Sequence, residues 1–139
     1  MTAPEGTETL PTAGQVAPVA EFRLRLRRFQ HETERVARDC GLTPGWYLLM
    51  LQIKGSPDLT ERTTVTALAQ RLQLAQSSVT ELVARAEQAG LIEREPSPND
   101  ARVAFLRLSA QGERSFARAF RDLAAERQAL REAIAELED

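Results

Sequence analysis

Apolar residues recur along the chain with three spacings, and each spacing predicts a different element. From Val19 to Cys40 they alternate in steps of three and four residues, which places their side chains on one stripe of a helix. A second stripe of this kind closes the chain, and no Gly or Pro follows Gly112 to interrupt one long final helix. The first stripe consists of Val19, Phe22, Leu26, Phe29, Thr33, Val36 and Cys40. The second, which Arg127 interrupts once, consists of Phe116, Phe120, Leu123, Arg127, Leu130, Ile134 and Leu137.

The segment from Pro44 to Lys54 is apolar on almost every side, which predicts a helix at the centre of the core. Thr43 is a suitable N-cap for this helix, and a proline fits its first turn. Gly41 ends the preceding helix, and the turn residues that begin at Gly55 end this one.

Two short helices are predicted next. Thr66 caps the first, over residues 67–73, and the second runs from Gln76 to about residue 89, where Gly90 ends it. The turn between the two helices is Gln73-Leu74-Ala75, so they form a helix-turn-helix.

A β-hairpin is predicted after the helix-turn-helix. Apolar residues recur at about every second position over 91–95 and 103–108, and Pro, Asn and Asp residues fill the loop between. Residues 62–64 predict a further short strand, and Ser109 caps the final helix. The sequence therefore predicts a mainly α fold with a small β-hairpin wing: a winged helix-turn-helix with long N- and C-terminal helices.

Composition and charge narrow the class of protein. The 139 residues are 42% hydrophobic and 27% charged, as in globular domains, and no apolar run is long enough to cross a bilayer. We find no signal peptide, so we expect a cytoplasmic protein with no membrane partner. The formal net charge of −2 counts mildly against nucleic-acid binding, although local placement of Arg matters more. Lys54 is the single lysine; either phosphate recognition or a GC-rich genome explains the bias towards Arg.

The helix that starts at Gln76 is the candidate DNA-reading element. A helix fits the major groove, and small or amide-bearing residues in its first turns can reach base edges and phosphates. Glu81 is unusual on such a surface; a carboxylate can accept a hydrogen bond from cytosine or pair with an Arg. A helix-turn-helix used only for packing or protein contact is the alternative. The candidate DNA contacts on the two helices are Thr66, Gln76, Ser77, Ser78, Thr80 and Arg85.

The loop over residues 95–102 is the second candidate DNA contact. Arg102 can enter a minor groove, whose negative potential attracts a guanidinium group. Asp100 cannot bind phosphate, so we expect it to orient an arginine, either Arg102 or Arg94. The alternative is an ordinary polar hairpin tip with a weak surface ion pair.

The central motif resembles the MarR (multiple antibiotic resistance regulator) family of winged-helix transcription factors. The resemblance rests on TVTALAQRLQLAQSSVTELVARAEQAGLIEREPSPNDARVAFLRLSAQG, above all on its Asp-x-Arg wing followed by Leu-Ser-x-x-Gly, and on LTPGWYLLMLQI. It implies a homodimer on a pseudo-palindromic operator, most often a repressor. It carries DNA contact to the residues named above on the second helix, and wing contact to Asp100 and Arg102. Ala101 and Ala75 depart from the family pattern, where a basic residue and a capping Ser or Thr are usual.

The predicted organisation has a flexible arm over 1–17 and a MarR-type domain over 18–139. Within that domain, 62–112 is the winged-helix lobe, and 18–40 and 113–139 are dimerisation helices. The predicted dimerisation residues are ten apolar residues of the two stripes: Val19, Phe22, Leu26, Phe29, Phe116, Phe120, Leu123, Leu130, Ile134 and Leu137. The alternative is that the stripes only cover the core of their own chain. The chain ends about 27 residues after Gly112, so we expect one final helix to replace the family's last two.

The resemblance also implies a small aromatic effector. Trp46, Tyr47 and Met50 are candidates to line its pocket, although ordinary core packing explains the same residues. Cys40, the single cysteine, is either a plain thiol or an oxidation sensor. We expect no enzyme, metal or cofactor, because His31 has no nucleophile or ligand pattern around it and no Gly-rich phosphate loop is present.

Overall fold

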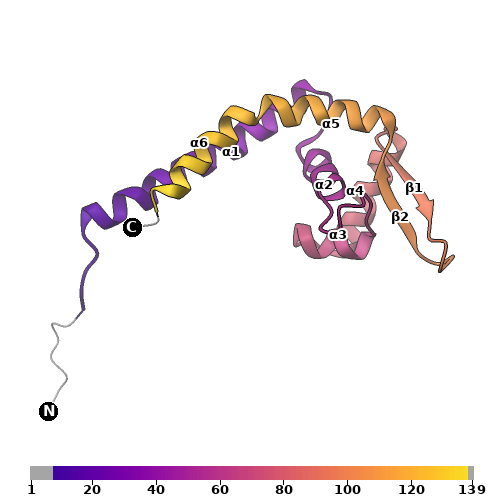
Figure 1. The fold of residues 1–139 in the computed structure, drawn as a ribbon, viewed down its shortest axis with the longest axis horizontal. Coiled ribbons are helices and arrows are strands. Elements are labelled where there is room, and N and C mark those ends of the chain that lie inside the picture. The colour runs from indigo at the N-terminus through magenta and orange to yellow at the C-terminus, as the bar shows by residue number, and fades with distance from the viewer. Residues whose placement is uncertain (1–7, 138–139) are drawn as a thin grey trace, which may run out of the picture. The chain divides into compact units, whose positions relative to one another are not determined.

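The computed structural model describes residues 8–137, in which six helices and one two-stranded sheet follow one another (Figure 1). Antiparallel pairing of the strands places Ile92 opposite Leu108 and Pro96 opposite Ala104. The predicted fold class is therefore confirmed. The elements in order are α1 (Ala13–Asp39), α2 (Pro44–Lys54), α3 (Val65–Leu72), α4 (Gln76–Gln88), β1 (Ile92–Pro96), β2 (Ala104–Leu108), α5 (Ala110–Asp122) and α6 (Ala124–Ala135).

The described chain divides into two compact units. Unit 1 contains the residues up to Glu32 together with those from Ala124 onward, and unit 2 runs from Thr33 to Leu123. Unit 2 therefore holds the helix-turn-helix, the hairpin and α5. Within unit 1, Ala133 of α6 is the single buried side chain among the described residues. No described helix meets the length and hydropathy that crossing a bilayer requires.

Helix α2 lies at the centre of the core of unit 2, as its apolar sequence predicts. Leu49, Met50 and Ile53 are fully buried in one cluster with residues of α3, α4 and both strands. Tyr47 stacks on Phe116 of α5, with ring centroids 5.5 Å apart. This helix therefore holds the helix-turn-helix and α5 together.

Two of the three predicted N-caps are confirmed and one is wrong. The hydroxyls of Thr43 and Ser109 accept from the N–H groups of Trp46 and Gly112. The cap of α3 is Thr64, not Thr66: its extended backbone lets its hydroxyl accept from the Ala67 N–H at 3.2 Å. The helix therefore begins two residues earlier than predicted.

Helix α1 begins at Ala13, inside the segment predicted to be a flexible arm. Thr12 starts it, because its backbone N–H donates to the Gln15 side chain and its hydroxyl accepts from the Gln15 N–H, a reciprocal cap. The prediction of an arm is therefore wrong for residues 13–17. Residues 1–7 of that predicted arm lie outside the described residues.

The prediction of one uninterrupted final helix is also wrong. Leu123 separates α5 from α6 with φ −97° and ψ 3°, outside helical geometry. It is the last residue of unit 2, and its side chain is almost fully buried there. The break between α5 and α6 therefore falls where the chain passes from unit 2 to unit 1, and not at a Gly or Pro that the sequence offers.

The short strand predicted over 62–64 is reduced to a single bridge. Thr63 pairs with Leu106 through hydrogen bonds of 3.1 and 2.7 Å in both directions. This bridge ties the segment before α3 to the second strand of the wing.

Candidate DNA-binding surface

The turn between α3 and α4 fixes which face of α4 is exposed. Gln73 adopts the left-handed conformation (φ 56°, ψ 44°) and ends α3. Val79, Val83 and Ala86 then bury one side of α4 against the core. Because this side is buried, the opposite side of α4 is presented to solvent.

The predicted reading residues of α4 lie on that exposed side. Gln76, Ser77, Ser78 and Thr80 are all exposed, and the Thr80 hydroxyl donates to the Gln76 carbonyl at 2.9 Å. Ala75 provides no side-chain cap, so the first N–H groups of α4 are left to solvent or to an anion. Thr66 is exposed on α3. The structure thus leaves the predicted contacts of the two helices accessible.

Glu81 and Arg85 form an ion pair on the same helix. Arg85 Nη2 lies 2.7 Å from Glu81 Oε1, and both side chains are about two-thirds exposed. Of the two interactions considered for Glu81, pairing with an arginine is the one present in the free protein. The pair keeps a cation on the exposed side of α4 and neutralises it at the same time.

The wing loop is organised by Asp100. Its Oδ1 accepts from the Arg102 backbone N–H at 3.0 Å and lies 3.4 Å from Arg102 Nε. Arg102 itself is 93% exposed. Arg94, the other partner considered, instead pairs with Glu87 of α4 at 2.8 Å. Asp100 therefore shapes the loop around an accessible Arg102.

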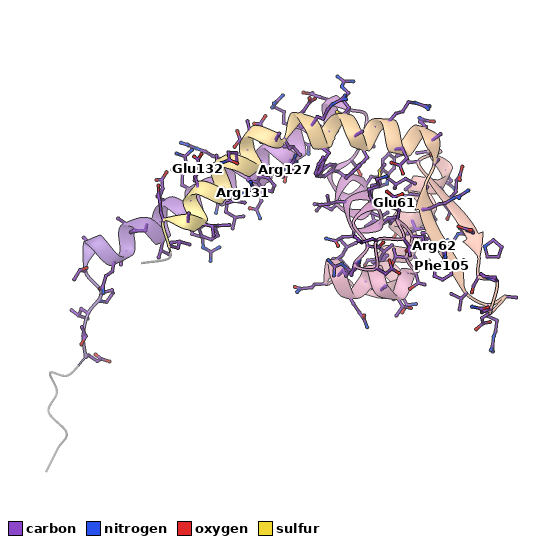
Figure 2. The ribbon with its side chains drawn as sticks, in the orientation of Figure 1. Glu61, Arg62, Phe105, Arg127, Arg131 and Glu132 are labelled. Atoms are coloured by element: carbon purple, nitrogen blue, oxygen red, sulfur yellow. The ribbon has the colours of Figure 1, made fainter. Side chains whose placement is uncertain are left out.

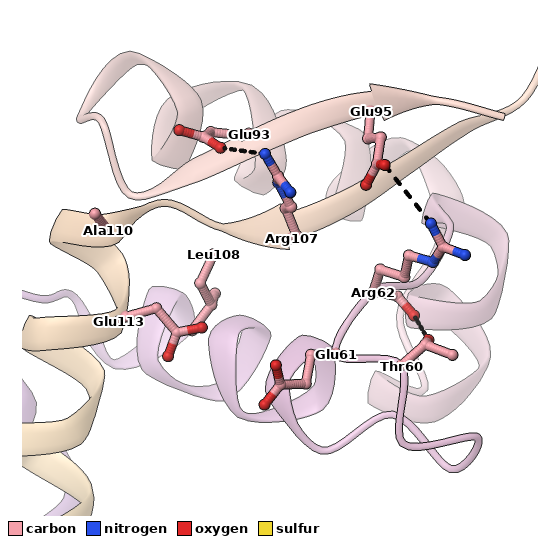
Figure 3. Close-up of a pocket in the computed structure, with 9 residues that line it drawn as sticks. All are labelled: Thr60, Glu61, Arg62, Glu93, Glu95, Arg107, Leu108, Ala110 and Glu113. Atoms are coloured by element: carbon pink, nitrogen blue, oxygen red, sulfur yellow. Dashed lines mark hydrogen bonds and ion pairs between the residues drawn. The ribbon is translucent and has the colours of Figure 1, made fainter. Parts of the chain in front are cut away.

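A polar cleft of about 620 Å³ lies on one face of the hairpin, and ion pairs cross it (Figure 3). Arg107 reaches Glu93 at 3.3 Å across the two strands. Arg62, from the segment before α3, reaches Glu95 at 3.6 Å. It also lies 4.9 Å from the centre of the Phe105 ring, and both residues are labelled in Figure 2. The Arg107 pair therefore joins the two strands, and the Arg62 contacts hold the hairpin against the segment before α3.

Lys54 makes a further bridge that sequence reasoning missed. Its Nζ lies 2.6 Å from Glu61 and 3.0 Å from Glu113, so it joins the end of α2 to the following loop and to α5. Hydrogen bonds to the two carboxylates raise the pKa of Lys54 above its usual value. Only its status as the single lysine set it apart in the sequence.

Two of the predicted effector-pocket residues are core residues. Tyr47 and Met50 are buried, and Trp46 is partly buried against the same cluster. A mostly apolar cavity of about 450 Å³ lies nearby in unit 2, between α2 and α5, and is lined by Leu51, Phe116 and Phe120 among others. Tyr47 is not among the residues that line this cavity, but its ring stacks on Phe116, which does line it.

The two predicted dimerisation stripes divide into buried and exposed members. Phe116 and Leu123 are buried within unit 2, so they stabilise the fold of their own chain. Phe22, Leu26, Phe29, Leu130 and Leu137 are partly buried. Val19, Phe120 and Ile134 are 42–51% exposed.

Cys40 is a partly buried thiol. Burial is the main reason that its pKa is raised, and Asp122 and Asp39 add to the effect while Arg118 opposes it. The opposing cation, Arg118, lies on α5, far from Cys40 in the sequence. This environment disfavours the reactive thiolate.

An exposed polar helix beside a hairpin with an accessible arginine defines a winged helix-turn-helix protein. A MarR family profile matches residues 41–103. A proposed transcriptional regulatory protein for the hcr operon of Thauera aromatica is 31% identical over 108 residues, which cover 76% of this chain. The chain belongs to the MarR family, as the resemblance implied. It spans 63% of the length of that curated relative.

Solved structures share the fold over most of the chain. Sco3205, a MarR family transcriptional regulator from Streptomyces coelicolor in complex with DNA, is 25% identical, with a TM-score of 0.63 over 92% of this chain and 78% of that one. MarR from E. coli in its apo form is 17% identical, with a TM-score of 0.69 over 94% of each chain. Members of this family are transcription factors and not enzymes, which confirms that expectation. Among the described residues, no group of His, Cys, Asp and Glu could hold a metal ion.

Proposed function

We propose that this protein is a sequence-specific DNA-binding transcriptional regulator that acts as a homodimer on a pseudo-palindromic operator. The observation that carries the proposal is the exposed polar N-terminal half of α4 together with the exposed Arg102 of the wing. The first turns of a helix with no side-chain cap suit the phosphates and base edges of the major groove. An arginine at a hairpin tip suits the adjacent minor groove. The DNA complex of Sco3205 supports this use of the fold.

The dimer is supported by the composition of unit 1. Among the described residues of unit 1, the two helical segments contain a single buried side chain, Ala133, so they form no core of their own. Leu10, Val16, Val19, Leu24 and Ile134 in this unit are 42–78% exposed. A second copy that covers these side chains removes apolar surface from water. A pseudo-palindromic operator requires the two copies of α4 to lie about 34 Å apart, one turn of DNA.

Repression follows from such a complex, because a dimer on an operator blocks access to the DNA beneath it. A small aromatic effector fits the apolar cavity between α2 and α5 better than the core positions of Tyr47 and Met50. Its volume of about 450 Å³ is in the range of small-molecule pockets, and aromatic rings line it.

The decisive experiment is a binding titration with duplex DNA from upstream of the protein's own gene. The control is a scrambled duplex of equal length and composition. We expect binding to the upstream duplex that is at least 1,000-fold tighter than to the scrambled one, a ratio of about 10³ or more being typical of specific binding. Affinity falls steeply as salt rises, because bound phosphates release counterions. Equal affinity for both duplexes at every salt concentration contradicts the proposal.

The second candidate is a winged-helix module that binds a protein partner and has little specific affinity for DNA. The neutralised Arg85 and the acidic residues around the hairpin favour it. Selection from a library of random-sequence duplexes discriminates the two. A DNA-binding regulator enriches a two-fold symmetric sequence, whereas a protein-binding module enriches none.

A further inference from the structure

Glu81 occupies the middle of the exposed side of α4. Successive residues of a helix turn by about 100°, so Ser77, Glu81, Ala84 and Gln88 form one row. The buried residues Val79, Val83 and Ala86 lie on the opposite side. All four members of the row are exposed. Any DNA read by this side of α4 therefore meets a carboxylate at its centre.

A carboxylate at this position has two opposite effects on DNA binding. It repels every phosphate, whatever the sequence, and it can accept a hydrogen bond from the exocyclic amino group of cytosine in the major groove. The 2.7 Å contact with Arg85 favours the second effect. The guanidinium offsets the negative charge of Glu81 and holds its side chain over one turn of the helix.

We propose that Glu81, held in place by Arg85, is a specificity-determining residue that reads cytosine at one position of each half-site. Arg85 engages Oε1, which leaves Oε2 able to accept from the N4 amino group of cytosine. The other N–H groups of the guanidinium are directed to phosphate or to guanine. This inference rests on the proposed DNA-binding function and assigns a base preference to its central residue.

The test begins with selection from a library of duplexes with a random core, using the full chain. Wild-type protein should enrich a site with an invariant cytosine in each half. Glu81→Ala should enrich a site without a preference at that position. Glu34→Gln is the matched control, because it removes one negative charge from an exposed residue of α1 and should leave every preference unchanged.

A chemical probe then locates the contact. In the selected duplex that cytosine is replaced by N4-methylcytosine, whose methyl group occupies the major-groove side of the amino group. Wild-type protein should bind the methylated duplex about 5- to 150-fold more weakly, the range expected for one specific base contact. Glu81→Ala should bind both duplexes equally. Circular dichroism of the variant should match wild type, because the side chain is exposed.

Each alternative outcome identifies what failed. If Glu81→Ala binds all duplexes more tightly and its base preferences are unchanged, Glu81 only repels phosphate. That result overturns this inference and leaves the proposed DNA-binding function in place. Wild-type protein that enriches no sequence overturns both. Arg85→Ala tests the positioning role of the ion pair. If this variant also loses the cytosine preference, the role is supported; if it keeps the preference, the role is contradicted.

Discussion

Gly112 in α5 packs directly against the backbone of Leu91 at the entrance to the wing. A Cβ at position 112 would overlap with the Leu91 carbonyl oxygen. The neighbouring Ser109 hydroxyl donates to the Gly90 carbonyl at 2.6 Å and accepts from the Gly112 N–H at 2.9 Å. The Ser-x-x-Gly sequence therefore joins the base of the hairpin to the start of α5, and it requires both residues.

Gly112→Ala should lower the free energy of unfolding by about 1–3 kcal/mol, as overpacking of a core does. The atoms that a Cβ would meet belong to the backbone of Leu91, so they cannot move away by a change of rotamer. Urea unfolding followed by circular dichroism measures the change. Gly14→Ala is the control, because Gly14 has room for a methyl group and alanine favours a helix. An equal loss in both variants contradicts the close contact.

Thr64→Ala and Thr66→Ala should have different effects. Thr64 caps α3, so its replacement should cost about 1 kcal/mol of stability. Thr66 is exposed within the helix, and its replacement should leave stability within about 0.5 kcal/mol. The same urea titration compares them. If Thr66 contacts DNA, Thr66→Ala should weaken DNA binding while the protein remains as stable as wild type.

Arg102→Ala should weaken DNA binding about tenfold or more, because a charge-assisted hydrogen bond is lost. The slope of log affinity against log salt should fall by about one. Fluorescence anisotropy at several salt concentrations measures both. Arg107→Ala makes the same change of charge in a residue that crosses the polar cleft to Glu93. An identical loss with Arg107→Ala would show that overall charge, rather than wing contact, governs affinity.

Ile134→Asp should convert the proposed dimer into monomers at micromolar concentration. The side chain is 45% exposed in unit 1, and a second copy that covers it would bury an unpaired carboxylate. Light scattering measures the mass. Leu59→Asp is the control, because Leu59 is 86% exposed in a loop of unit 2. A wild-type protein that is monomeric under these conditions contradicts the dimer.

Cys40 should react slowly with iodoacetamide at neutral pH, because burial raises the pKa of its thiol and the thiolate is the nucleophile. The alkylation rate of the folded protein should rise at a higher pH than the alkylation rate of the same chain unfolded in urea. A group whose pKa is raised by folding stabilises the native state below its unfolded pKa, and this contribution is lost as pH rises through the folded pKa. Cys40→Ala should therefore reduce the alkaline loss of stability. Fast alkylation at pH 7 would favour a sensor role instead.

The sequence by itself determined the elements whose signals are local. The apolar run of α2, the caps Thr43 and Ser109 and the Gly90 stop each act within one turn of chain, and the structure has all of them. The exposed polar half of α4 could be predicted as well, since burying Val79 and Val83 on one side leaves the other side to solvent. The family motif added the order of these elements.

Only the tertiary structure decided the features that depend on distant partners. Helix α5 ends at Leu123, which is buried in unit 2, although no Gly or Pro near it in the sequence predicts a break there. Phe116 belongs to the core because Tyr47, far away in the chain, stacks on it. Arg94 of β1 forms its ion pair with Glu87 of α4, so Asp100 contacts Arg102 and not Arg94. Heptad spacing places apolar side chains on one stripe of a helix, but packing in three dimensions decides which of them are buried within the chain.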